Sequence, residues 1–326
     1  MKRPSTGGIV RVLIAISLTA LVGWKSRPSE ILSALAHARL GPIAAATALV
    51  FLDRALMAYR WLVLLRPFAG PDGPRFTAVM RIFFVSTFVG TFLPATVGVG
   101  AVRAYSLSRE GVAASAAVAS VVMDSVLGVF SLLLMAVVGL MFARQMAADP
   151  VVVGALVVTA LGCAVAAAVV FSRHVDRWLG AIVGLLPWAG VRDVAGRLLG
   201  AMQTYAATQG ALGNVLAGSI GVQALRIVQA YCLGVGLGIA QPLTTYVAFI
   251  PLILLVMLLP ITVNGLGTSQ AAFVWFFAQV GVASPDAFAL SVLFVGLGVV
   301  GNLPGGVLYA TGGVSRGSRN AGQPTT

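Results

Sequence analysis

Hydrophobic residues occur in long, nearly uninterrupted runs along most of the chain, and short polar or charged stretches separate them. A helix needs about 20 apolar residues to cross the hydrocarbon core of a bilayer. The pattern therefore predicts membrane-spanning helices at residues 9–24, 41–65, 78–94, 113–141, 151–171, 211–238, 243–259, 266–280 and 287–309. The runs at 243–259 and 266–280 are short and also fit a pair of re-entrant half-helices, so the predicted number of spans is seven to nine.

One of these runs is broken in an unusual way. The apolar residues 82–93 reach Pro94, pass into small residues that include Gly100, and end on Arg103 and Tyr105. Proline lacks the backbone N–H that a helix interior needs, and glycine leaves helical geometry easily. The sequence predicts that the helix breaks here, close to a cationic side chain. The polar connection expected after the break contains Arg103.

The second half of the chain repeats this break. The sequence Leu93-Pro94-Ala95-Thr96-Val97 is matched by Leu259-Pro260-Ile261-Thr262-Val263, which continues as Asn264-Gly265-Leu266-Gly267. The two prolines lie 260 − 94 = 166 positions apart, about half of the 326 residues. Paired Pro/Gly interruptions in corresponding halves are a pointer to a transporter binding site. The pattern predicts an internal repeat, and chance recurrence of Leu-Pro pairs at helix ends is the alternative.

The predicted organisation is a single transmembrane domain over residues 1–314 with approximate halves 1–171 and 211–314. The segment 172–210 joins them, and because arginines alternate there with tryptophan and leucine, it is predicted to lie as amphipathic helix in the headgroup region. Residues 315–326 are polar and small and are expected to be disordered.

Composition excludes a soluble protein and fixes the fold class as all-α, a polytopic helical membrane protein. Hydrophobic residues make up 59% of the chain and charged residues 9%, and the mean hydropathy is +0.99. The net charge of +12 comes from basic residues scattered among membrane-edge loops. That distribution fits anionic lipid headgroups rather than nucleic acid.

Chemistry-bearing residues are too sparse for catalysis. Both cysteines fall in apolar runs, and the two histidines have no second ligand near them in sequence. The chain has no Gly-x-x-x-x-Gly-Lys-Ser/Thr loop and no Ser/His/Asp or Cys/His set. We therefore expect no cofactor, no metal and no enzymatic activity.

Charged residues inside the predicted spans are the candidate functional groups, because such charges are costly and usually face a cavity or a partner. Asp53 and Arg60 are too far apart along one helix for a short salt bridge, so each is expected to pair with another helix. Asp124 fits either a proton relay or an ion pair with Arg60 or Arg226.

Residues at the two breaks complete the candidate site. Arg103 and Tyr105 could form a clamp for a phosphate headgroup, or anchor the chain at the membrane edge. Asn264 and Gln270 could bind a polar substrate or cap broken helix ends. The candidate substrate-binding residues are Arg60, Pro94, Thr96, Arg103, Tyr105, Asp124, Arg226, Pro260, Asn264, Gly265, Gly267 and Gln270.

Several motifs occur in an order that resembles a known family. They are Tyr59-Arg60-Trp61-Leu62-Val63-Leu64-Leu65, Phe92-Leu93-Pro94-Ala95-Thr96-Val97-Gly98 through Arg103, Asp124, Asn264-Gly265-Leu266-Gly267 and Leu303-Pro304-Gly305-Gly306. Together they resemble the flippase-like membrane domain of lysylphosphatidylglycerol synthases and its stand-alone relatives, over almost the whole chain. The resemblance implies movement of lipids or lipid-linked intermediates across a prokaryotic membrane. Because no aminoacyl-transferase domain follows the membrane part, lipid lysylation is not expected.

Three positions depart from that resemblance. Gly100 and Gln270 stand where relatives often carry an acid, and Ser125 stands where they often carry arginine. These departures weaken the argument for proton coupling through those positions. They leave Asp124 as the one acidic residue that matches the family pattern.

The expected function is that of a flippase in the prokaryotic cell membrane, which moves an anionic lipid or a lipid-linked intermediate. Membrane lipids are the expected partners; hopanoids, polyprenyl-linked sugars and aminoacylated phospholipids all fit the resemblance. The alternative is a non-transporting scaffold for a lipid-modifying or glycosyltransferase partner, which would dock on the basic segment 173–202.

Overall fold

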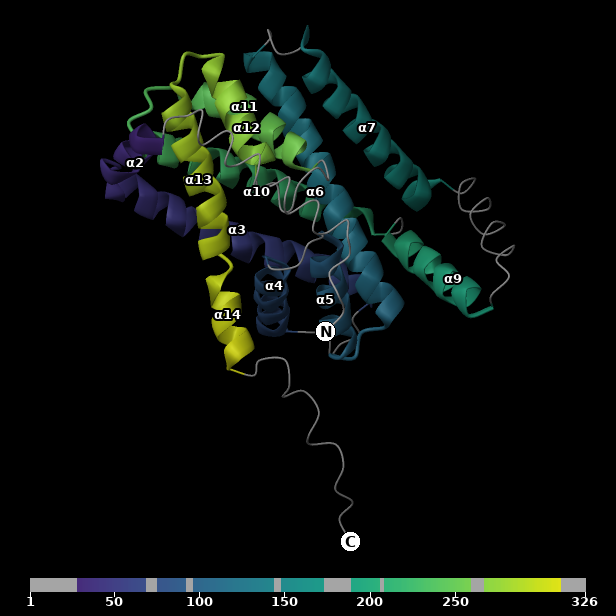
Figure 1. Ribbon diagram of the computed structural model, residues 1–326. Coiled ribbons are helices and arrows are strands. Elements are labelled where there is room, and N and C mark those ends of the chain that lie inside the picture. The colour runs from purple at the N-terminus through teal and green to yellow at the C-terminus, as the bar shows by residue number, and fades with distance from the viewer. Residues whose placement is uncertain are drawn as a thin grey trace. The chain divides into compact units, whose positions relative to one another are not determined.

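The computed structural model describes residues 28–68, 75–91, 96–143, 148–172, 189–205, 208–258 and 267–311 (Figure 1). The predicted first span, both predicted breaks around their prolines, residues 173–188 of the amphipathic segment and the C-terminal tail lie outside these ranges. Within the described residues all regular structure is helical.

The helices follow the predicted hydrophobic runs closely, mostly to within about two residues at each end. Their bounds are α2 Pro28–Ala36, α3 Leu40–Leu65, η1 Arg66–Phe68, α4 Phe76–Thr91, α5 Thr96–Ser108, α6 Ala114–Phe142, α7 Pro150–Phe171, α9 Ala189–Thr204, α10 Gln209–Gly236, α11 Leu243–Met257, α12 Thr268–Ala278, α13 Ser284–Val300 and α14 Leu303–Ala310.

Five helical stretches in the described residues are long and apolar enough to cross a membrane. They are Leu40–Phe68, Ala114–Phe142, Val152–Val170, Gln209–Gly236 and Ser284–Ala310, and the apolar helices Phe76–Gly90 and Leu243–Met257 are shorter. The all-α, multi-pass class is thus confirmed, whereas the count of seven to nine spans and the internal repeat stay predictions. At 11 residues, α12 extends for only about 17 Å, which favours the half-helix alternative for this segment.

One predicted element is wrong in detail, and another contains an unexpected turn. The polar connection expected after the first break is helical as far as Ser108, and the turn begins only at Arg109. The span expected at 287–309 is present as the stretch Ser284–Ala310, within which a turn at Gly301 and Asn302 separates α13 from α14. The second helix starts there because a proline stands in its first turn, where a missing N–H costs nothing.

The chain groups into two compact units, and each takes segments from both halves of the sequence. The first unit comprises Met1–Arg54, Val129–Leu161 and Ser219–Gly301; the second comprises Ala55–Gly128, Gly162–Gly218 and Asn302–Thr326. The halves 1–171 and 211–314 describe a repeat in the sequence and stay a prediction.

The core of the first unit is built from α10 to α13, with aromatic rings in edge and stacked contacts. Tyr246 and Phe249 of α11 meet Phe277 of α12 at ring-centre distances of 5.3 and 5.7 Å, and Phe273 of α12 meets Phe294 of α13 at 5.6 Å. Such pairs add to the stabilisation that burial gives. This packing fixes the inner faces of α11 and α13.

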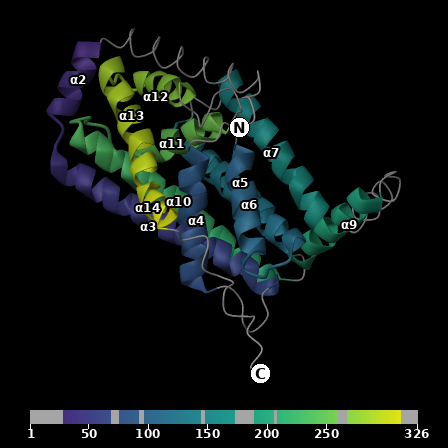
Figure 2. The ribbon, with the colours of Figure 1, turned by 60° about the horizontal axis from the view of Figure 1, so that its bottom comes forward.

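The core of the second unit joins the C-terminal half of α3 to α4, α5 and α6 (Figure 2). Trp61, Leu64 and Leu65 of α3 are fully buried in it. The short helix α14 packs closely on α4, because Gly305 lies against the backbone carbonyl of Phe84 and leaves no room for a side chain.

Tyr205 holds the end of α9 in the second unit. Its phenol O–H donates to the carbonyl of Leu64 at 2.9 Å, and its ring meets the edge of Phe68 at 5.3 Å. Burial, with a smaller contribution from Asp124, raises the pKa of Tyr205 above its ordinary value, so the phenol stays a proton donor.

Candidate functional site

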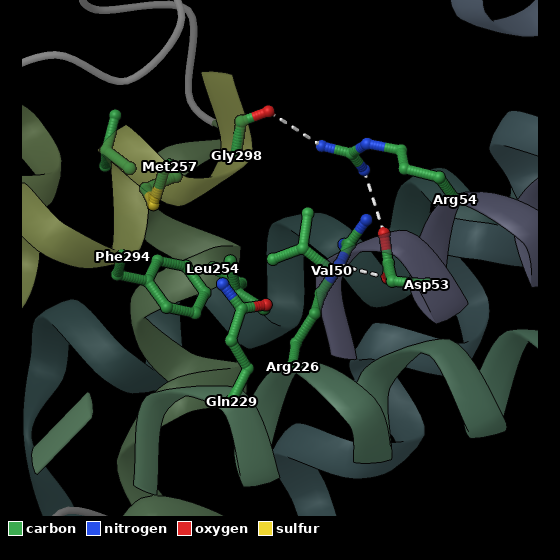
Figure 3. Close-up of a pocket in the computed structure, with 10 residues that line it drawn as sticks. Val50, Asp53, Arg54, Arg226, Gln229, Leu254, Met257, Phe294 and Gly298 are labelled. Carbon is green, nitrogen blue, oxygen red and sulfur yellow. Dashed lines mark hydrogen bonds and ion pairs between the residues drawn. The ribbon is translucent and has the colours of Figure 1, made fainter. Parts of the chain in front are cut away.

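The first polar group in the membrane-spanning helices is the Asp53 cluster, which we define as Asp53, Arg54 and Arg226. Arg54 Nη1 donates to Asp53 Oδ2 at 2.8 Å, and Arg226 Nε donates to Asp53 Oδ1 at 3.2 Å. Arg54 Nη2 also donates to the carbonyl of Gly298 at 3.3 Å. One carboxylate thus orients two guanidinium groups from α3 and α10, as Figure 3 shows.

This cluster lines a partly open cavity of about 180 Å³, which we call the Arg226 pocket. Its walls come from four helices of the first unit, α3, α10, α11 and α13. They are formed by Val50, Asp53, Arg54, Arg226, Gln229, Leu254, Met257, Phe294, Val295 and Gly298. The polar groups gather on the α3 and α10 side, with apolar side chains of α11 and α13 opposite (Figure 3). A cavity of this kind suits an amphiphile.

Helical spacing explains how the pocket is assembled. Val50, Asp53 and Arg54 are three and four residues apart on α3, and Arg226 and Gln229 are three apart on α10, so each set shares one helix face. Asp53 lies within one residue of the midpoint of α3, and Arg226 lies about 5 Å beyond the midpoint of α10. The pocket is therefore near the middle of both helices.

Burial of these charges costs free energy, and the three side chains differ in their exposure to solvent. The side chain of Asp53 is 4% exposed, that of Arg54 14% and that of Arg226 25%. Two cations and one anion give these three side chains a net charge of +1. Guanidinium groups offer paired N–H donors that match phosphate or carboxylate oxygens, so the pocket is equipped to bind an anion.

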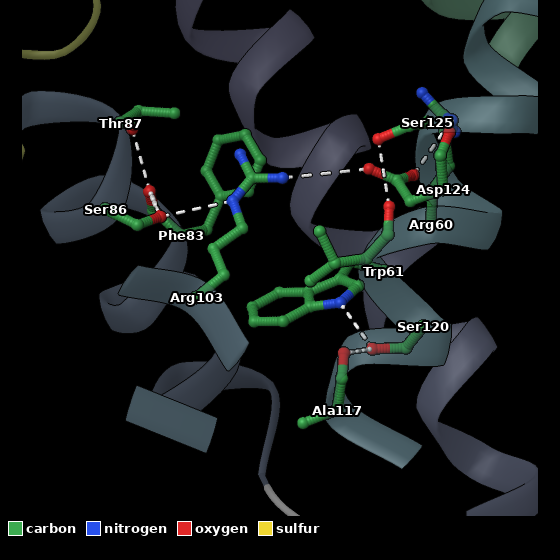
Figure 4. A network of polar contacts seen from close by, with 11 residues as sticks. Arg60, Trp61, Phe83, Ser86, Thr87, Arg103, Ala117, Ser120, Asp124 and Ser125 are labelled. Atoms are coloured by element: carbon green, nitrogen blue, oxygen red, sulfur yellow. Dashed lines mark hydrogen bonds and ion pairs between the residues drawn. The ribbon is translucent and has the colours of Figure 1, made fainter. Parts of the chain in front are cut away.

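The second polar group is the Asp124 cluster, which we define as Arg60, Arg103 and Asp124 (Figure 4). Arg60 Nη2 donates to Asp124 Oδ1 at 2.9 Å, and Arg103 Nη1 lies 3.7 Å from Asp124 Oδ2. This cluster ties α3 and α5 to α6 within the second unit. Of the alternatives for Asp124, the ion pair with Arg60 is present, and the expected pairing of Asp53 with another helix is made by Arg226.

Aromatic rings close around Arg103. Its guanidinium carbon lies 4.3 Å from the ring centre of Phe83 and 5.7 Å from that of Trp61, and its Nε donates to Ser86 Oγ at 3.1 Å. Trp61 in turn donates to Ser120 at 3.1 Å. The side chains of Arg60, Asp124 and Arg103 are only 3%, 7% and 9% exposed. The geometry fits a structural ion network better than a headgroup clamp.

The remaining predicted site residues are scattered. Thr96 begins α5, and Tyr105 of the same helix is 62% exposed. Pro94, Pro260, Asn264 and Gly265 lie outside the described residues.

Gln270 acts as a cap at the start of α12. Its Oε1 accepts the backbone N–H of Gly267 at 2.6 Å and the hydroxyl of Ser269 at 3.0 Å. Gly267 has a φ of +84°, a backbone conformation that glycine adopts without a steric cost. Of the two alternatives for Gln270, substrate binding and helix capping, the structure therefore shows helix capping.

Sequence reasoning missed most of the pocket. Of its polar residues only Arg226 was a predicted substrate-binding residue; Asp53 was expected only to pair with another helix, and Arg54 and Gln229 were not predicted site residues. Their signal was available, because Asp53-Arg54 stands at the centre of one apolar run, and Arg226 and Gln229 share a face of another. Among the described residues, no group of three or more His, Cys, Asp or Glu could hold a metal ion.

Comparison with known proteins assigns the chain to a protein family. A search of curated proteins found no match. A family model described as the lysylphosphatidylglycerol synthase TM region matches residues 8–305, which is most of the chain. The apolar helices and the ordered motifs agree with this match, and the chain belongs to the lysylphosphatidylglycerol synthase TM region family.

Proposed function

We propose that the protein is a lipid translocator, which moves the headgroup of an anionic lipid or lipid-linked intermediate across the cell membrane of a prokaryote without altering it chemically. The observation that carries the proposal is the Arg226 pocket, a cavity with two arginines and one aspartate near the middle of apolar helices. Membership in a family of membrane regions from lipid-modifying synthases supports a lipid as the ligand.

The pocket addresses the main barrier to lipid movement. A charge in the hydrocarbon core costs from about 2.5 to more than 10 kcal/mol, depending on how far water and side chains follow it. In the pocket, a headgroup phosphate would exchange water for the N–H groups of Arg54 and Arg226. Apolar residues such as Leu254 and Phe294 form the opposite wall, where the lipid's own apolar part can lie.

Asp53 prevents the pocket from binding the headgroup too tightly. The carboxylate holds both guanidinium groups at 2.8 and 3.2 Å, so an incoming phosphate has to compete with it. Translocation requires a site that binds well enough to admit the substrate and weakly enough to release it. The carboxylate therefore both positions the arginines and supports release.

The test is translocation in proteoliposomes. Phosphatidylglycerol with a fluorophore on its acyl chain is placed in both leaflets, and a membrane-impermeant reductant quenches the outer leaflet. The intact protein is expected to make the inner leaflet accessible as well. Arg226→Gln should slow this roughly tenfold or more, because a charge-assisted bond of about 1.5–3 kcal/mol is lost.

Arg81→Gln is the matched control, because Arg81 forms a part-exposed ion pair with Glu110 at 3.2 Å and does not line the pocket. Equal rates for Arg226→Gln and the intact protein would show that the pocket is not the route. If phosphatidylglycerol, phosphatidic acid and cardiolipin all stayed in their leaflets, translocation would be rejected. The scaffold function would then be pursued through the exposed arginines of α9, Arg192 and Arg197.

A further inference from the structure

We infer that the Arg226 pocket selects a lipid whose headgroup carries one phosphate and no cationic group, and that it discriminates against lysylated phospholipid. The inference deepens the proposed function and rests on it, because it names the ligand class of the same site. It is notable because the matched family is named for synthases that make the lysylated lipid.

Charge balance is the first argument. The charged residues that line the pocket are Asp53, Arg54 and Arg226, with a net charge of +1. A phosphatidylglycerol headgroup brings one negative charge and neutralises this set. Its lysyl ester brings one phosphate and two ammonium groups, so it is a net cation that enters a net cationic site. Like charges at close range in a poorly solvated cavity repel each other.

The position of Asp53, the one carboxylate among the described residues that line the pocket, is the second argument. Both oxygens of Asp53 already accept from arginine, Oδ2 from Arg54 and Oδ1 from Arg226. An ammonium group could reach this carboxylate only by displacing a guanidinium. The remaining acceptors that the structure offers there, such as the carbonyl of Gly298, are neutral, and Arg54 uses it at 3.3 Å.

The opening of the pocket is the third argument. The pocket is partly open, and Arg226 is the most exposed of the three charged side chains. A lysyl extension that reaches toward solvent from a phosphate in the pocket therefore brings its ammonium groups close to another cation.

Gln229 offers a way to reverse the selectivity. It lies one helical turn from Arg226 on α10 and contributes a neutral amide to the pocket. Gln229→Glu keeps the shape of the side chain and brings the pocket to a net charge of zero. Gln279→Glu is the control, because Gln279 is an exposed glutamine of the same unit that does not line the pocket.

The experiment measures binding to the purified full chain in detergent, with dioctanoyl phosphatidylglycerol, its lysyl ester and glycerol 3-phosphate as ligands. We expect phosphatidylglycerol to bind roughly tenfold or more tightly than the lysyl ester, and Arg226→Gln to lower its affinity by a similar factor. Gln229→Glu should reduce the preference at least about tenfold, and Gln279→Glu should leave it unchanged.

Three results would overturn the inference. The first is that the lysyl ester binds as tightly as phosphatidylglycerol or more tightly, and the second is an unchanged preference in a folded Gln229→Glu protein. The third is that glycerol 3-phosphate binds as tightly as the lipid, which would mark a site for soluble anions. If Gln229→Glu does not fold, Arg226→Gln and the ligand comparison decide. Translocation without this preference contradicts only the selectivity, whereas the preference without translocation contradicts only the proposed transport.

Discussion

Removal of the carboxylate of Asp124 is the sharpest test of how the Asp124 cluster stabilises the protein. Asp124→Asn keeps the shape of the side chain but leaves Arg60 and Arg103, 2.9 and 3.7 Å from its oxygens, without their shared anion. All three side chains are less than a tenth exposed, so little water can take the place of the carboxylate. Loss of one partner from a buried ion pair costs about 3–5 kcal/mol, and we expect a loss of unfolding free energy in that range.

Reversible unfolding of the protein in mixed micelles, followed by circular dichroism, measures this loss. Glu110→Gln is the control, because its ion pair with Arg81 is 30% exposed on both sides, and such pairs contribute about 0–1 kcal/mol. Were Asp124→Asn to change the unfolding free energy by no more than Glu110→Gln, the cluster could not be a buried ion network, and its assignment as a structural element would fall.

Two further predictions test packing in the second unit. Tyr205→Phe should lower the unfolding free energy by about 1 kcal/mol through loss of the bond to Leu64, measured in the same micelles. Because burial raises the pKa of Tyr205, the unfolded protein loses this proton first, so stability should fall as pH rises above about 10, and less so in Tyr205→Phe. Gly305→Leu should destabilise by at least about 1–3 kcal/mol, because a side chain there collides with the backbone of Phe84; unchanged thermal stability would contradict the close approach of α14 to α4.

Helix locations could be predicted from the sequence because the requirement to bury backbone polar groups in lipid allows few alternatives. The runs predicted at 113–141 and 151–171 correspond to α6 and α7 with ends shifted by one residue or less. Composition and hydrophobic run length carry this information directly. It is local, and it needs no knowledge of what each helix contacts.

The helix α5 shows where this reasoning fails. Its glycine-rich start was read as broken backbone, whereas Gly100 lies in the helix and faces α6, where an added Cβ would stand 3.0 Å from Val121. Gly90 of α4 likewise lies against Val99. Glycine in membrane helices often permits close packing, and only the neighbouring helix distinguishes that use from a break.

Pairing of charges was the part that the sequence left open. Asp124 had two possible partners, Arg60 and Arg226, and nothing in the spacing chose between them. The structure pairs Asp124 with Arg60 across 64 positions and Arg226 with Asp53 across 173 positions. Such choices depend on which helix faces meet, which is a property of tertiary packing.

Under the proposed function, burial rather than residue type separates the binding site from the structural cluster. Each has one aspartate shared by two arginines. In the Asp124 cluster, the rings of Phe83 and Trp61 cover Arg103, so an anion from outside cannot replace the carboxylate without opening the core. In the Asp53 cluster, Arg226 is a quarter exposed and faces a cavity, so exchange of one anion for another costs little rearrangement. In the proposed function, the same set of three charges holds helices together in one unit and receives a headgroup in the other.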